Sequence, residues 1–171
     1  QNSTVKYAYI IRVEADAGLT HTETTLAGDL VLNTTTYPVT NIKFSMLESP
    51  FGFPSWFNYT PTSSGGGSMT VSITAIGTAK FGIRGESVTT LLELTLTTGG
   101  TPSTYLNIST PVNPSDYSGA SGFLILADSI YEGGVANART SDNHIRVFRS
   151  SGANWGLGTT RYVRGTITYP F

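Results

Sequence analysis

Residues that could do acid–base or metal chemistry are few in this chain and lie far apart in the sequence. The histidines are His21 and His144, and neither has the short spacing to a second ligand that a metal site requires. Carboxylates that could serve as the acid and base of glycoside hydrolysis are present, but no pair stands out among Glu48, Glu86, Glu93, Asp128 and Glu132. The absence of cysteine excludes a thiol nucleophile, a disulfide framework and a zinc–thiolate site. We therefore expect a protein that is not an enzyme and that needs no cofactor or metal.

Two further patterns resemble reactive motifs and have simpler explanations. The glycines Gly65 to Gly67 are not followed by the Gly-Lys-Ser/Thr of a phosphate-binding loop, so a flexible hairpin turn explains them better. The lysines Lys6, Lys43 and Lys80 could form an isopeptide crosslink only where burial keeps the amine neutral. Lys43 alternates with apolar neighbours, which places it on the outer face of its predicted strand.

Four asparagines stand in the N-x-S/T pattern of N-linked glycosylation: Asn2, Asn33, Asn58 and Asn107. Each is expected where a glycan could reach solvent, namely in the tail, in a turn, in an aromatic segment and at a strand end. The sequence therefore predicts an extracellular protein that carries N-linked glycans.

Aromatic residues form a cluster around Trp56 and Phe57, which Phe51, Phe53 and Tyr59 flank. The cluster could stack on sugar rings or fill the end of a β-domain core, and burial of several large side chains favours the core. Trp155 poses the same choice, and packing is again favoured.

Composition narrows the range of partners. Charged residues make up 12% of the 171 residues and the formal net charge is -1, so a nucleic-acid partner is not expected. No apolar stretch is long enough to span a membrane. The chain begins at Gln1 without an initiator methionine, as a mature secreted protein would.

The apolar pattern has period two along most of the chain, which is typical of half-buried strands. The predicted strands are 19–25, 29–32, 39–47, 69–75, 80–84, 88–97, 104–109, 123–130, 144–148 and 162–169. Residues 110–122 contain prolines and glycines and are expected to form a surface loop. The spacing of the predicted strands, in a sequence without any helical period, predicts an all-β fold, an immunoglobulin-like antiparallel β-sandwich.

The N-terminal tail carries the most regular alternation. Large strand-forming side chains occupy every second position, at Val5, Tyr7, Tyr9, Ile11 and Val13. Since no turn signal precedes residues 15–18, we expect that the tail does not fold back as a tight hairpin and pairs instead with a distant segment or another molecule. It could be an ordinary first strand or a donor strand that completes the sheet of a neighbouring subunit.

The tail and the closing stretch, His144 to Gly152 and Gly158 to Tyr169, are similar to the ends of bacterial chaperone–usher pilins. The sequons, the absent cysteines and the Thr/Ser/Tyr-rich, charge-poor composition resemble the extracellular thread filaments of thermoacidophilic, Sulfolobales-type archaea. These resemblances imply a glycosylated cell-surface filament whose identical subunits polymerise by donor-strand complementation and support adhesion or biofilm formation.

The expected organisation is therefore an N-terminal donor strand over residues 1–15 and an immunoglobulin-like β-sandwich over residues 16–171. Two other functions remain open: a carbohydrate-binding module and a phage or viral receptor-binding head. A binding module would be monomeric with an exposed aromatic platform, whereas a viral head would be trimeric with its N-terminus leading to a shaft.

Overall fold

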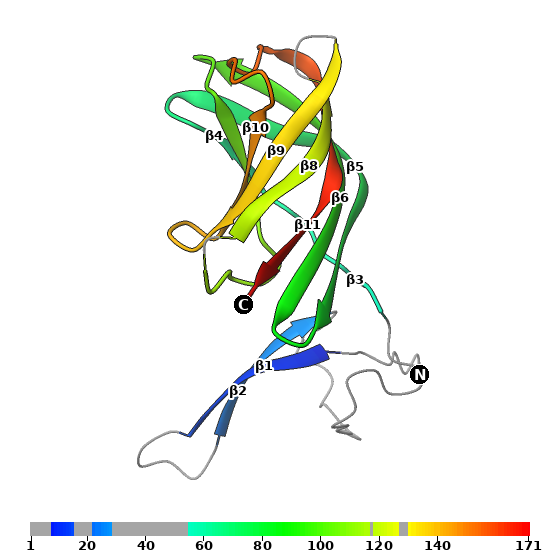
Figure 1. The fold of residues 1–171 in the computed structure, drawn as a ribbon, viewed down its shortest axis with the longest axis vertical. Coiled ribbons are helices and arrows are strands. Elements are labelled where there is room, and N and C mark those ends of the chain that lie inside the picture. Colours follow the sequence, from blue (N-terminus) through cyan, green and yellow to red (C-terminus); the bar gives the residue numbers. More distant parts are fainter. Residues whose placement is uncertain (1–7, 16–21, 29–54, 117, 127–129) are drawn as a thin grey trace, which may run out of the picture. The chain divides into compact units, whose positions relative to one another are not determined.

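A computed structural model describes residues 8–15, 22–28, 55–116, 118–126 and 130–171 (Figure 1). The chain divides into two compact units, residues 1–58 and residues 59–171. The described secondary structure consists of strands, which confirms the all-β prediction. Among these described residues there is no long apolar helix that could cross a membrane.

The first unit contains an antiparallel pair, β1 (Ala8–Ala15) and β2 (Thr22–Gly28). The expectation that the tail would not fold back is therefore wrong, because the six residues 16–21 are enough to connect two antiparallel strands. The register shifts between Ile10 and Arg12, so the residues of β1 do not alternate between the two faces of the sheet in one unbroken pattern. Tyr9, Ile11 and Val13 of the predicted donor strand lie in β1, whereas Val5 and Tyr7 lie outside the described residues.

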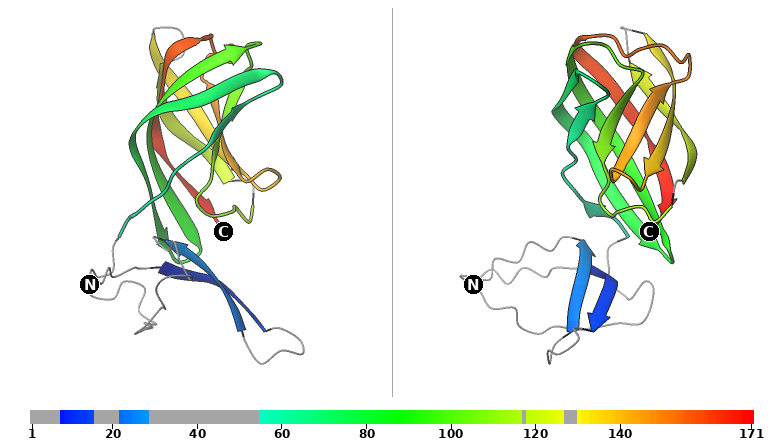
Figure 2. Two further views of the ribbon diagram at one scale, coloured as in Figure 1. Left: turned by 180° about the vertical axis from the view of Figure 1, so that it is seen from behind. Right: turned by 90° about the vertical axis from the view of Figure 1, so that its left-hand side faces the viewer.

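The remaining strands form one nine-stranded sheet with the order β3-β5-β6-β11-β8-β9-β10-β7-β4. The sheet curls strongly, as the two views in Figure 2 show. Its strands are β3 (Phe57–Asn58), β4 (Ser63–Gly65), β5 (Met69–Arg84), β6 (Ser87–Gly100), β7 (Tyr105–Ser109), β8 (Ser118–Leu126), β9 (Tyr131–Arg139), β10 (His144–Arg149) and β11 (Gly158–Pro170). The antiparallel class is thus confirmed, but these hydrogen bonds join a single sheet, whereas an immunoglobulin-like sandwich requires two.

The core lies inside the curl and follows from strict alternation in the long strands. In β6 every second residue is buried, including Leu92, Leu94 and Leu96, as the sequence predicts. From the neighbouring β11, Val163, Ile167 and Tyr169 enter the same core. Each buried side chain of this size contributes about 1.5 to 3 kcal/mol relative to an exposed one.

One short segment joins the two ends of the sheet order. Its Tyr59 amide donates to the carbonyl of Ala79 in β5 at 3.1 Å, and its Thr62 carbonyl accepts from the amide of Ser109 in β7 at 2.9 Å. β4 then pairs with β7, while the Ser63 hydroxyl donates to the Val71 carbonyl of β5 at 3.3 Å. The segment 59–65, which we call the closing segment, therefore binds both edges of the curled sheet.

The glycines after the closing segment make the tight return into β5. A Cβ on Gly66 would lie 2.3 Å from Ser103 Oγ, and Gly67 has a positive φ of 57°. Only glycine takes both positions without strain. A turn is therefore confirmed at Gly66 and Gly67, whereas Gly65 is the last residue of β4, which pairs with β7 and not with β5.

Trp155 anchors the loop between β10 and β11. Its side chain is fully buried and its indole Nε1 donates to the Val147 carbonyl at 3.3 Å, while its amide donates to the Ser103 carbonyl at 2.7 Å. Packing rather than sugar stacking was expected here and is confirmed. Trp56, in contrast, is 44% exposed, although its neighbour Phe57 is buried.

We expect Trp155→Ala to lower the free energy of unfolding by about 3 to 5 kcal/mol, because it empties a large buried volume. Trp155→Phe should cost less, since it keeps most of the ring contacts and loses one hydrogen bond worth about 1 kcal/mol. Urea unfolding of both variants measures these losses, with Trp56→Ala as the exposed control. Equal losses at the two tryptophans would contradict the assigned burial.

The buried tyrosines make stability fall at alkaline pH. Burial raises the pKa of Tyr169 from 10.0 to about 12 and also raises the pKa of Tyr59. Below pH 10 both side chains are neutral in the folded and unfolded states, so this contribution to stability is complete. Above pH 10 the unfolded chain releases protons that the folded chain retains, and stability falls by about 1.4 kcal/mol per pH unit for each tyrosine.

We expect Tyr169→Phe to lose about 1 kcal/mol at neutral pH, because the Tyr169 hydroxyl donates to the Val112 carbonyl at 3.0 Å. The free energy of unfolding of the same variant should fall less steeply between pH 10 and pH 12, because only Tyr59 would still contribute to the fall. Urea midpoints measured across that range test this. A slope identical to that of the parent chain would show that Tyr169 does not carry the alkaline transition.

Candidate functional site

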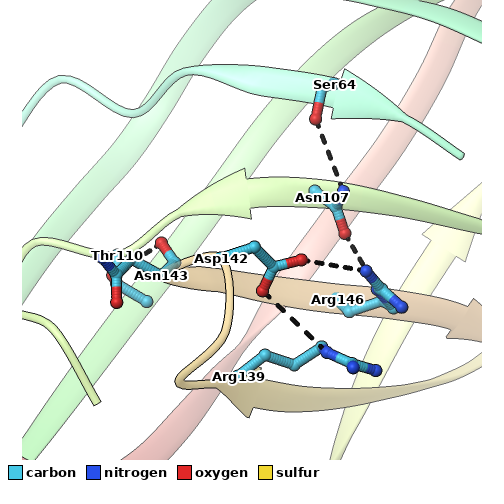
Figure 3. A network of polar contacts seen from close by, with 7 residues as sticks. All are labelled: Ser64, Asn107, Thr110, Arg139, Asp142, Asn143 and Arg146. Carbon is cyan, nitrogen blue, oxygen red and sulfur yellow. Dashed lines mark hydrogen bonds and ion pairs between the residues drawn. The ribbon is translucent and has the colours of Figure 1, made fainter.

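A row of polar side chains crosses four strands on the outer face of the sheet (Figure 3). The strand registers place Asn137 of β9 opposite Arg146 of β10, Arg146 opposite Asn107 of β7, and Asn107 opposite Ser64 of β4. We call these four residues the polar row. Neighbouring residues of the same strands, Leu106, Ile108, Ile145 and Val147, are fully buried, so the row lies on the side away from the core.

Hydrogen bonds connect most of the polar row. Arg146 Nε donates to Asn107 Oδ1 at 3.1 Å, and Asn107 Nδ2 donates to Ser64 Oγ at 3.4 Å. The other end of the Arg146 guanidinium donates through Nη2 to Asp142 Oδ2 at 2.9 Å. Arg146 therefore holds an amide and a carboxylate at once from two different nitrogens of its planar fork, whereas the donors of lysine all lie on one nitrogen.

The turn between β9 and β10 supplies the carboxylate. Asp142 also lies 3.9 Å from Arg139 Nε, so it faces two arginines. Asn143 closes the turn with a positive φ of 54°, and its carbonyl accepts from the Thr110 hydroxyl at 2.8 Å (Figure 3). This hydrogen bond ties the turn to the chain that leaves β7.

An aromatic row runs beside the polar row. Val135, Phe148 and Tyr105 are opposite one another on β9, β10 and β7. The Tyr105 and Phe148 rings are 5.9 Å apart and tilted by 52°, and the Arg146 guanidinium lies 4.0 Å from the centroid of the Tyr105 ring. A cation over an aromatic face is attracted by the ring quadrupole. The two tilted rings and the arginine thus lie side by side on one surface.

Two polar atoms next to the rows are enclosed but unpaired. Asn137 Oδ1 and His144 Nδ1 have no hydrogen-bond partner within the part of the chain that the structure describes, although neither atom is exposed. Such an atom loses the stabilisation of its hydrogen bonds to water unless a water or a ligand replaces it. Both belong to half-buried side chains on the outer face of β9 and β10.

The sequons divide into different environments. Asn58 is exposed, but Asn107 is only 8% exposed and donates from its amide nitrogen, the atom that a glycan would occupy. The expectation that Asn107 faces solvent is therefore wrong, because the side chains of neighbouring strands cover the middle of β7. Asn2 and Asn33 lie outside the described residues.

Those residues considered for catalysis that the structure describes do not come together as a reactive pair. Glu93 accepts a hydrogen bond from the Tyr162 hydroxyl at 2.5 Å, which raises the pKa of that tyrosine, and Glu132 pairs with Arg149. Glu86 is exposed, while Glu48, Asp128 and His21 lie outside the described residues. Among the described side chains, no group of three His, Asp or Glu residues could hold a metal ion.

Lys80 does not meet the requirement for an isopeptide crosslink. Its side chain is exposed on β5, whereas the crosslink requires a buried amine. Lys6 and Lys43, the other two candidates, lie outside the described residues.

Comparison with protein-family models, with curated proteins and with solved structures finds no match for this chain. The site must therefore be judged on its own chemistry. It offers charged and neutral hydrogen-bond donors, amide oxygens and an aromatic surface, which together suit the recognition of a polar ligand.

We expect Arg146→Ala to lower the free energy of unfolding by about 2 to 3 kcal/mol, because Asn107 Oδ1 and Asp142 would lose a charged partner. Arg146→Lys should recover part of this loss, since lysine keeps the charge but lacks the separate nitrogens with which arginine reaches both partners. Thermal or urea unfolding measures the series, and Arg84→Ala at the exposed end of β5 is the matched control. If Arg146→Ala lowered the free energy of unfolding as little as Arg84→Ala, the polar row would not contribute to stability.

Proposed function

We propose that the chain is a non-enzymatic extracellular recognition domain, a receptor-binding head whose ligand is carbohydrate. The observation that carries the proposal is the outer surface of β7, β9 and β10, where the aromatic row lies directly beside the polar row. Sugars present both apolar ring faces and many hydroxyls, so a site for them combines a stacking surface with precisely placed polar groups.

The polarity of the surface supports a neutral ligand. Arg146 is paired with Asp142, and Arg139 lies near the same carboxylate, so Asp142 offsets one of the two arginine charges. Asn137 Oδ1 and His144 Nδ1 can each bond to a hydroxyl after a small movement of the side chains around them. A hydroxyl serves either atom, because it both donates and accepts.

The closing segment joins the two edges of the sheet in the second unit, which favours a receptor-binding head over a filament subunit that accepts a donor strand. The closing segment binds both β5 and β7, so no strand-wide gap separates these two edges. The stretch of β5 between the two contacts carries two register shifts, at Ile73/Ala75 and Ile76/Thr78. Bulges of this kind make an edge a poor template for an added strand. The proposal keeps the antiparallel β-domain but not the immunoglobulin-like sandwich.

Donor-strand assembly is the second candidate function, and one observation favours it. β1 and β2 form a two-stranded sheet, and a sheet of two strands is marginally stable by itself in water. It therefore needs cover from another segment or another subunit. Under this alternative the tail residues Val5, Tyr7, Tyr9, Ile11 and Val13 would still enter a neighbour, and the chain would form glycosylated cell-surface filaments.

Binding of the full chain to a panel of immobilised oligosaccharides tests the head. We expect Asn137→Ala and His144→Ala to weaken binding to the best oligosaccharide by about threefold to tenfold each, which corresponds to one lost hydrogen bond. Ser72→Ala, on the exposed side of β5, should leave binding unchanged. All three variants should keep the melting temperature of the parent chain within a few degrees.

Electron microscopy of the same material separates the two candidates. Discrete particles together with oligosaccharide binding support the head. Filaments that Tyr9→Asp and Ile11→Asp abolish, but that Lys6→Asp leaves intact, would reject the head in favour of donor-strand assembly.

A further inference from the structure

Exposed apolar side chains concentrate on one part of the outer face. Leu124, Ile130, Tyr131 and Val135 are between 38% and 70% exposed, and they belong to β8, to β9 or to the residue just before β9. The intervening residues Phe123, Ile125 and Ala136 are buried in the core. These four side chains therefore point away from the core, and large clustered apolar patches commonly mark interaction sites.

Large side chains and glycines alternate within this patch. The register of β8 and β9 places Leu124 opposite Gly133 and Gly122 opposite Val135. Each cross-strand pair thus has one large apolar member and one glycine, and the large member changes strand from one pair to the next. We call these four positions the checkerboard.

The two glycines leave real depressions in the surface. Both are exposed, a Cβ on Gly122 would meet no atom within 4 Å, and a Cβ on Gly133 would make only ordinary contact with Ser150 at 3.5 Å. Neither glycine has a positive φ, so the backbone does not require glycine at these positions. Glycine within a strand weakens it and often marks a place where another molecule approaches closely.

A checkerboard of this kind is complementary to itself. A two-fold axis parallel to the strands and midway between β8 and β9 places Leu124 of one copy over Gly133 of the other, and Val135 over Gly122. Two-fold contacts require such self-complementarity, because the same surface serves both subunits.

Charges beside the checkerboard also permit contact between identical copies. Arg164 of β11 lies opposite Leu124 on one side and opposite Glu93 of β6 on the other. An exposed base and a half-buried acid are therefore neighbours next to the patch, so this side of the patch does not present charges of a single sign to a second copy. The formal net charge of -1 adds almost no repulsion between copies.

We propose that the checkerboard on β8 and β9 is a contact between two copies of this chain, related by a two-fold axis. The contact does not depend on the ligand proposed above. It shares Val135 with the aromatic row, and it does not include Arg146, Asn107 or Ser64 of the polar row, which lie on β10, β7 and β4, the strands beyond β9 in the sheet order.

Sedimentation velocity on the full chain, over a wide range of concentration, tests the contact. We expect a dimer that Gly122→Arg converts to a monomer, because the new side chain has room on the single subunit but fills the depression that the partner needs. Leu124→Asp should do the same by removing a projecting apolar side chain. Ser72→Arg, an exposed strand position on β5, is the control and should remain dimeric. Circular dichroism and melting temperature establish that all variants fold.

Disulfide trapping gives a second readout that does not depend on affinity. The chain has no cysteine, so a mixture of Gly122→Cys and Val135→Cys chains should form a crosslinked heterodimer on mild oxidation. The Ser72→Cys chain should not crosslink with either. A parent chain that is monomeric throughout, a trimer, or a dimer that survives Gly122→Arg would each overturn the proposal.

Discussion

The curled sheet depends on the hydrogen bonds that the closing segment makes with both of its ends. Without the bonds from Tyr59 to Ala79 and from Ser109 to Thr62, the edges of β5 and β7 would be open to other chains. Pro61 within this segment is buried and has no amide to satisfy, which suits a connection that crosses from one edge to the other. The outer surface can therefore carry binding groups, because the core and both edges are already occupied.

Much of this fold could be predicted from local patterns, but the short strands β3 and β4 and the longer β9 could not. Alternating large side chains identified β6, β10 and β11, whereas β9 has small residues at its buried positions, Gly134, Ala136 and Ala138. The reason lies on β8: a Cβ on Gly134 would lie 2.8 Å from Ile125 Cγ2, so the neighbouring strand fills the space that β9 leaves. A hydrophobic pattern read along one strand does not contain that information. The same limit explains why residues 118–122 of the expected loop belong to β8.

The polar row was beyond prediction for a related reason. Asn107 attracted notice as a sequon and Arg146 lies in a predicted strand, but their contact spans 39 positions in sequence. The pairing of β7 with both β4 and β10 decides that Asn107 meets Ser64 and Arg146. Alternation fixes which residues share a face of one strand, whereas the partner strand and its register follow from the whole sheet.

The position of β11 has a consequence for how the protein is made. This last strand lies between β6 and β8 in the sheet, and it pairs Gly158 with Thr98 and Tyr169 with Val88. The ribosome therefore releases β11 after every other strand of this sheet, although the middle of the sheet cannot form without it. Contacts so distant in sequence are slow to establish, on the order of milliseconds to seconds for all-β domains. Until β11 has been synthesised, the apolar faces of β6 and β8 lack their common neighbour. A chaperone would matter most in that interval.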